Sequence, residues 1–100
     1  MDKVYNQIQQ IRQNPIIHLG KRSLHLLKAY LDGYIEYHNE ISDKPDYFFL
    51  PKFQEFVQER YNISTTHNWV SLISFYSSSE ENAFDNFYKL LDEFFSENAD

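Results

Sequence analysis

The sequence predicts an all-α protein, a single domain of about five helices spanning residues 1–100. Apolar residues recur at helical spacing in five separate segments, and no segment alternates cleanly with the period of two that marks a strand. A chain of 100 residues that is 42% hydrophobic has room for one core and enough apolar material to fill it.

The first half of the chain predicts two helices. Val4, Ile8 and Ile11 form an apolar stripe that ends before Pro15, because proline disfavours helix in the residue before it. Residues 16–20 are expected to be a connector. Ser23 then fits the cap of a longer helix, whose inward side is expected to comprise Leu24, Leu27, Leu31, Tyr34, Ile35, His38 and Ile41.

Gly33 interrupts this second helical pattern. A glycine inside a helix costs about 1 kcal/mol relative to alanine, so it indicates either a bend or the close approach of another backbone. We expect close packing. Residues 42–46 combine turn formers with a proline and form the loop that divides the chain in half.

The second half predicts a third helix that starts near Pro51 and ends near Asn62. Its inward residues are expected to be Phe53, Phe56, Val57 and Tyr61. Residues 67–77 fit either helix or strand, and helix is favoured because no other segment offers a partner strand.

The final helix has the clearest signal. Ser78 and Glu81 fit a capping box. A broad aromatic stripe follows, in which Phe87 and Leu91 occupy the middle and are expected to be core residues; its members are Phe84, Phe87, Tyr88, Leu91, Phe94 and Phe95.

The net charge of −6 comes from this last segment alone. Residues 1–79 contain eight acids and eight bases, whereas residues 80–100 contain seven acids and one base. Glu81, Asp85 and Asp92 lie within roughly 40° of each other on a helix and form an acidic ridge. The ridge is either a solvated helix face or a docking surface for a cationic partner.

No motif for catalysis or cofactor binding is present. There is no cysteine, the two glycines form no phosphate loop, and the four histidines lack metal-site spacing. We therefore expect no enzyme activity, no metal and no cofactor, and the acidic balance argues against direct nucleic-acid binding. The sequence offers no export signal and no apolar run of membrane length, so a cytoplasmic location without membrane contact is expected.

The aromatic content of 18%, including eight tyrosines, favours a binding module over a catalyst. Tyrosine combines large area with a polar tip and is enriched in interface hot spots. A core rich in tyrosines with their hydroxyls at its rim explains the composition equally well.

Several segments carry a resemblance to a known family: IRQNPIIHLGKRSL at 11–24, LDGY at 31–34, FQEFV and RY at 53–57 and 60–61, and EENAF and LLDEF at 80–84 and 90–94. They resemble small α-helical immunity proteins of contact-dependent growth inhibition and related polymorphic toxin systems. The resemblance implies an antitoxin that binds a cognate toxin domain and has no catalytic residues of its own.

Toxin domains of such systems are often ribonucleases or other nucleases, which need a cationic cleft to hold their substrate. An acidic inhibitor is suited to cover that cleft. The candidate contact residues are Glu81, Asp85 and Asp92, followed by Glu40, Asp43, Asp46 and Tyr47 of the central loop region. The alternative is a non-enzymatic adaptor that binds a partner protein through an aromatic-rich groove.

Overall fold

The computed structural model describes residues 3–44, 46–65 and 67–97, and all regular structure in these ranges is helical. The helices are α1 (Lys3–Gln13), α2 (Pro15–Leu19), α3 (Leu24–Ile41), α4 (Leu50–Arg60), α5 (Trp69–Phe75) and α6 (Glu80–Glu97). The predicted all-α class is confirmed, and so is helix for the ambiguous segment 67–77. The described ranges hold six helices, one more than the five predicted.

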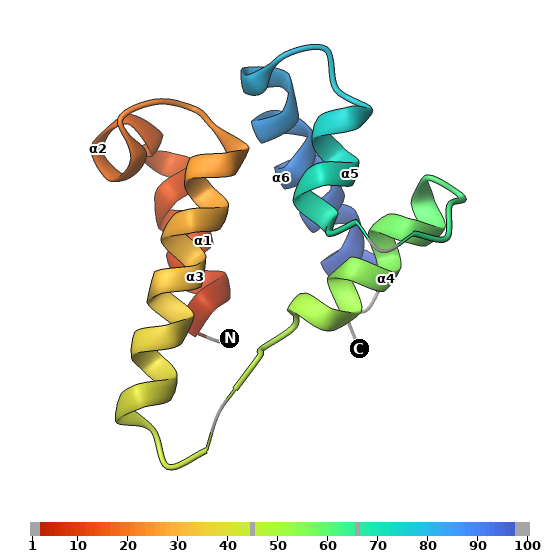
Figure 1. Ribbon diagram of the computed structural model, residues 1–100. Helices are drawn as coiled ribbons and strands as arrows, with labels where there is room; N and C mark the ends of the chain where they lie inside the picture. The colour runs from red at the N-terminus through yellow and green to blue at the C-terminus, as the bar shows by residue number, and fades with distance from the viewer. Residues whose placement is uncertain (1–2, 45, 66, 98–100) are drawn as a thin grey trace.

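The helices form two groups that meet along α3 and α6. Figure 1 shows α1, α2 and α3 on one side and α4, α5 and α6 on the other, with the long α3–α4 connection running below them. The upper part of α3 packs against α5 and α6, while α6 also packs against α4 and α5. The two long helices therefore hold the groups together.

Aromatic rings fill the centre of the molecule. Phe87 of α6 is fully buried, stacks on Trp69 at a centroid distance of 5.1 Å and meets the edge of Phe53 at 5.6 Å. Leu91 is also fully buried, so the burial predicted for the middle of the α6 stripe is confirmed. The hydroxyl of Tyr88 donates a hydrogen bond of 2.7 Å to the carbonyl of Ile8 and connects α6 to α1.

The expectation of an irregular connector at 16–20 is wrong, because these residues belong largely to α2. Pro15 stands in the first turn of α2, where its fixed φ suits a helix and its missing N–H costs nothing. Gly20 ends the helix with φ +87° and donates its N–H to the carbonyl of Ile16 at 2.8 Å. A proline start and a left-handed glycine end are thus enough for a short helix.

Two expectations for α3 are also wrong, although its Ser23 cap is confirmed by a hydrogen bond from the Leu26 N–H. Gly33 does not pack closely, since a Cβ built there has no described atom within 4 Å apart from its own chain neighbours and helix backbone. Ile41 is 68% exposed instead of facing inward. Figure 1 shows the reason: the last turns of α3 extend below the helices against which its upper part packs.

The cap of α6 lies one residue later than predicted. Ser79, not Ser78, accepts the hydrogen bond of the Asn82 N–H on its side-chain oxygen, and its carbonyl accepts the first helical bond from Ala83. The Asn82 side chain accepts a reciprocal bond from the Ser78 N–H. Glu81 therefore takes no part in the cap.

Candidate partner-binding surfaces

Two members of the predicted acidic ridge already have basic partners within the chain. Asp92 forms a forked ion pair with Arg12 of α1, with N–O distances of 2.9 and 2.8 Å. Asp85 pairs with Arg22, which lies between α2 and α3. The hydrogen bonds that Arg12 donates to the Asp92 carboxylate raise the pKa of its guanidinium group. Much of the negative charge of the ridge is thus offset locally.

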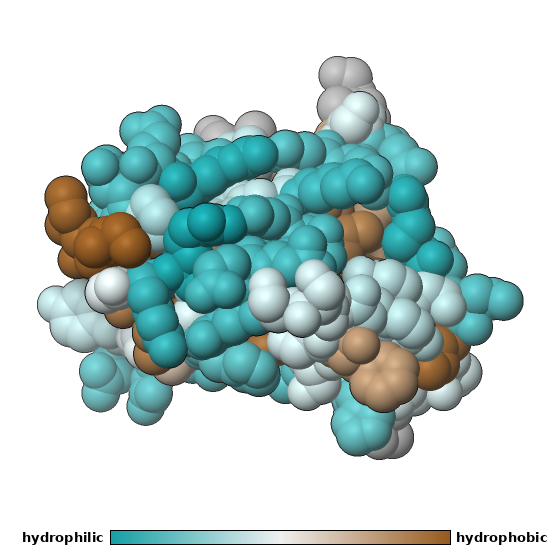
Figure 2. All heavy atoms as spheres, turned by 90° about the horizontal axis from the view of Figure 1, so that it is seen from above, coloured by the Kyte–Doolittle hydropathy of each residue, from teal (hydrophilic) through white to brown (hydrophobic). Residues whose placement is uncertain are grey.

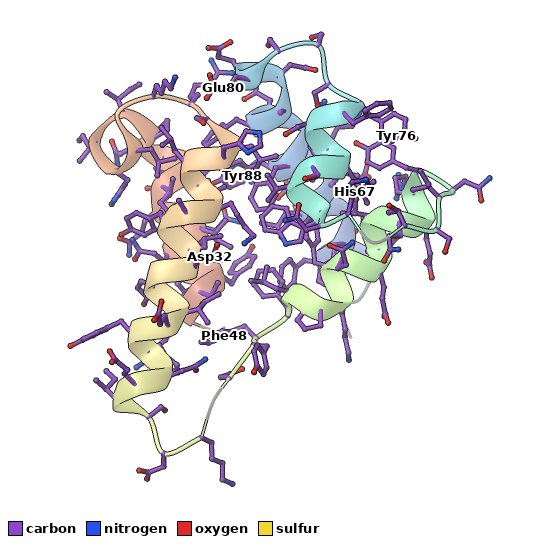
Figure 3. All side chains as sticks on the ribbon, viewed as in Figure 1. Asp32, Phe48, His67, Tyr76, Glu80 and Tyr88 are labelled. Atoms are coloured by element: carbon purple, nitrogen blue, oxygen red, sulfur yellow. The ribbon has the colours of Figure 1, made fainter. Side chains whose placement is uncertain are left out.

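Other acids of α6 follow the same pattern. Glu93 and Glu97 both face Arg60 of α4, at 2.9 and 3.9 Å. Glu80 accepts a hydrogen bond from the Ser23 hydroxyl and lies 3.3 Å from Lys21, and these contacts lower the pKa of its carboxyl group. Figure 3 shows Glu80 at the upper end of the molecule, where α6 begins.

Glu81 is the one acid of α6 without an ion pair to a described side chain. Asp100, which contributes to the charge arithmetic, lies outside the described residues. The basic partners of the other acids come from α1, the α2–α3 connection and α4. Their alignment beside α6 is a consequence of tertiary packing, which the sequence pattern of α6 does not contain.

The central segment has the opposite character. Glu40 and Asp43 are exposed and form no ion pair with a described side chain, and Glu36 one turn earlier in α3 shares this property. Lys44 is the one lysine or arginine among the described residues 36–47, and His38 is the one histidine. The lower end of α3 and the following loop therefore carry uncompensated negative charge.

Hydrogen bonds give this loop a defined shape. The Asn39 side chain accepts a bond of 2.7 Å from the Asp46 N–H, and the Asp46 carboxylate accepts one of the same length from the Phe48 N–H. Phe48 adopts φ +59° and lies against His38 at a centroid distance of 5.1 Å. Figure 3 shows Phe48 beside the lower part of α3. Tyr47 is 68% exposed next to it.

Tyr47 borders a groove of about 410 Å³ between α3 and the start of α4. Ile35, Leu50 and Trp69 supply apolar walls, and the ion pair between Lys28 and Asp32 lies at its edge; Pro51, Gln54 and Asn68 complete the lining. Three of the four central-loop candidates, Glu40, Asp43 and Asp46, are thus exposed on the same α3–loop segment as the tyrosine that borders this groove.

A second apolar groove, of about 310 Å³, lies between α5 and the connection that joins α4 to α5. Phe75 is 79% exposed there, and Tyr76 stacks on Tyr61 with a centroid distance of 4.3 Å. Burial, followed by the neighbouring Tyr76, raises the pKa of the Tyr61 hydroxyl. Figure 3 shows Tyr76 and His67 on this same side of the molecule. Tyr61, predicted as an inward residue, is half-buried and packs against the core, and its ring also stacks on the exposed Tyr76.

A third exposed apolar group is on α2, where Ile16 and Ile17 project from the helix. Figure 2 views the molecule from above and shows a largely hydrophilic face with brown spheres at its left edge, on the side where α2 lies.

One serine and histidine pair escaped the sequence analysis. Ser74 Oγ lies 3.4 Å from His25 Nε2, near three further serines at the start of α6. A nucleophile also needs a group that orients its base, and no described side chain forms a hydrogen bond with the other ring nitrogen of His25. In the described ranges no group of three His, Cys, Asp or Glu residues is placed to hold a metal ion.

No helix within the described ranges combines the length and the apolar character that a membrane crossing requires. Comparison with known proteins found no matching family model, no matching curated protein and no matching solved structure.

Proposed function

We propose that this protein is an immunity protein that binds and neutralises a cognate cationic toxin domain, with a ribonuclease or another nuclease as the toxin. One observation carries the proposal: exposed acids without basic partners gather at the lower end of α3 and in the loop after it. Glu36, Glu40 and Asp43 form no ion pair with a described base, and Lys44 is the one lysine or arginine in the described part of the same segment, residues 36–47. The sequence resemblance to immunity proteins supports the same function.

This charge distribution suits capture of a basic protein. A negative surface that meets a positive cleft accelerates association, and rates approach 10⁸ M⁻¹s⁻¹ at low salt when such steering operates. Acids that are already paired, such as Asp85 and Asp92, contribute less to an external field, because the opposite charge lies beside them. We therefore assign the first contact to the central segment and a secondary place to the ridge of α6.

Tyr47 supplies the anchor in this arrangement. Its ring is 68% exposed beside an apolar groove, and tyrosines in such positions dominate many interfaces. The neighbouring acids form the polar rim that surrounds an anchor in protein interfaces.

The test is surface binding kinetics against the toxin domain encoded beside this gene, in a salt series. The double variant Glu40→Lys with Asp43→Lys should lower the association rate at least tenfold at low salt. Glu55→Lys with Glu59→Lys on α4 is the matched control, since both acids are exposed and lack a described ion-pair partner. The control should change the rate less than threefold.

Two results would contradict the proposal. Failure of the wild-type protein to bind the toxin domain would remove the immunity function. Equal rate losses in both double variants would mean that the net charge alone matters, and that the central segment has no special place.

An adaptor that binds a partner protein through an aromatic groove is the second candidate, favoured by the exposure of Phe75 beside Tyr76. It predicts that Phe75→Ser abolishes partner binding while Glu40→Lys with Asp43→Lys leaves it intact. The immunity proposal predicts the reverse.

A further inference from the structure

The carboxyl-terminal half of α3 carries a short apolar strip that nothing in the described chain covers, whereas Tyr30 before it is half-buried against α1 and α2. The members of the strip lie within about 80° of each other around the helix: Gly33, Tyr37 and Ile41. Tyr37 is 63% exposed and Ile41 is 68% exposed, whereas Leu27 and Leu31 on the core-facing side of α3 are fully buried. We call these three residues the outer strip.

Gly33 is the unusual member of the outer strip. A glycine in the middle of a helix costs about 1 kcal/mol relative to alanine, and a Cβ at Gly33 would meet no described neighbouring element within 4 Å. The fold therefore gains nothing from the missing side chain. What the glycine does provide is a place where the main chain of another molecule can approach α3 closely.

Acids line one side of the outer strip. Asp32, Glu36 and Glu40 follow each other at intervals of four residues, a spacing at which like charges repel on a helix. Lys28 pairs with Asp32, but Glu36 and Glu40 have no described ion-pair partner. Glu40 also lies in the last turn of α3, where the helix dipole disfavours negative charge.

These charges identify the chemistry of the occupant. A second copy of this chain would bring the same acids face to face, and an anionic lipid surface would repel them. A basic segment relieves the repulsion and covers the apolar strip at the same time. The strip follows the axis of α3 for about two turns, which suits contact with one face of an amphipathic helix.

We infer that the outer strip is the docking face for a basic amphipathic helix of the partner. The main chain of that helix crosses α3 at Gly33, its apolar side chains contact Tyr37 and Ile41, and its lysines or arginines face Glu36 and Glu40. The inference rests on the proposed function only where the partner is identified as the toxin domain.

The first arm of the test uses a model ligand, a synthetic helical peptide of about 18 residues with leucines on one face and lysines on the other. Titration into ¹⁵N-labelled protein should shift the amide resonances of residues 33–41 most strongly. A peptide with glutamates in place of the lysines should cause no shifts there.

The second arm separates binding from folding. Gly33→Gln should raise the melting temperature by about 2–5 °C, because glutamine is the better helix former. The same variant should weaken peptide binding at least tenfold, since the added side chain occupies the crossing point. Ser96→Gln on the exposed side of α6 is the matched control and should bind like the wild type.

Three results would overturn the inference: shifts concentrated on α6 or on the groove at Phe75, equal affinity of Gly33→Gln and wild type, or a dimer of this chain that buries the same face. The two proposals fail separately. If the peptide binds at the outer strip but the neighbouring toxin domain is not bound, the docking face stands and the immunity function falls. If the toxin domain is bound equally well by Gly33→Gln, the immunity function stands and the docking face falls.

Discussion

Truncation of Phe87 to alanine should reduce the free energy of unfolding by about 3–5 kcal/mol, the usual cost of removing a buried phenylalanine side chain. The structure supports a value in the upper part of that range. Phe87 is fully buried and contacts the rings of Trp69, Phe53 and Tyr88 at centroid distances of 5.1, 5.6 and 5.0 Å. Aromatic pairs of this geometry contribute about 0.5–1.5 kcal/mol beyond the area they bury.

Urea denaturation followed by the fluorescence of Trp69 and by circular dichroism measures this loss. Domains of this size are stable by roughly 5–15 kcal/mol, so Phe87→Ala retains only a small margin. Phe87→Leu keeps most of the volume and should lose about 1.5 kcal/mol or less, which leaves a complete transition to fit.

Phe75→Ala is the matched control, because it makes the same chemical change at a side chain that is 79% exposed. Its loss should stay within about 0.5 kcal/mol, as for other surface substitutions. Equal losses at Phe75 and Phe87, or a loss below about 1 kcal/mol at Phe87, would refute the assignment of the α6 aromatic stripe to the core.

Three further predictions concern the cap, an ion pair and pH. Ser79→Ala should lower the free energy of unfolding, measured by denaturation, by about 0.5–2 kcal/mol, whereas Ser78→Ala should lower it by less than about 0.5 kcal/mol. The reverse order would place the cap at Ser78, the position expected from the sequence. Arg12 and Asp92 are both substantially exposed, so a double-mutant cycle between them should give a coupling free energy of about 0.2–1 kcal/mol. This coupling should decrease in 1 M salt. A coupling of zero at low salt would mean that the ion pair does not stabilise the contact between α1 and α6. Burial raises the pKa of Tyr88, so the unfolded state loses this proton first and stability should fall as pH rises above about 10. Tyr88→Phe should be less stable than the wild type at neutral pH, but its free energy of unfolding should fall less as the pH rises. Urea denaturation at a series of alkaline pH values tests this. Parallel losses of stability in the two proteins would contradict the assignment of the alkaline loss to Tyr88.

Local patterns were sufficient for the long helices and insufficient for their ends. The α6 stripe is predictable because helical periodicity is a property of neighbouring residues. The capping residue of α6 is harder to predict, since Ser78 and Ser79 are adjacent and equally suited to the position. The choice between them depends on whether Asn82 or Glu81 lies at the third helical position. The α2 helix was missed because five residues are too few to show a period.

Long-range features were not predictable from the same patterns. Asp92 and Arg12 are 80 residues apart in sequence, so the charge of α6 can be summed from the sequence but its compensation cannot. Ile41 fits the inward helical pattern and Gly33 was expected to meet a closely packed backbone, yet both are exposed because the end of α3 continues past its neighbours. Which part of a helix is covered depends on the lengths and positions of the other helices.

Salt weakens two kinds of charge interaction in this protein, long-range attraction of a partner and short ion pairs within the chain. The distances over which they act make it possible to distinguish them. The Debye length is about 8 Å at physiological ionic strength and about 30 Å at 0.01 M, so long-range steering is strongly screened between these conditions. The Arg12–Asp92 contact of 2.8 Å is far shorter than either length and is weakened much less. A steep loss of association rate over that salt interval would therefore report the exposed acids at the end of α3. Loosening of α6 requires higher salt, where a change in circular dichroism would reveal it independently of binding.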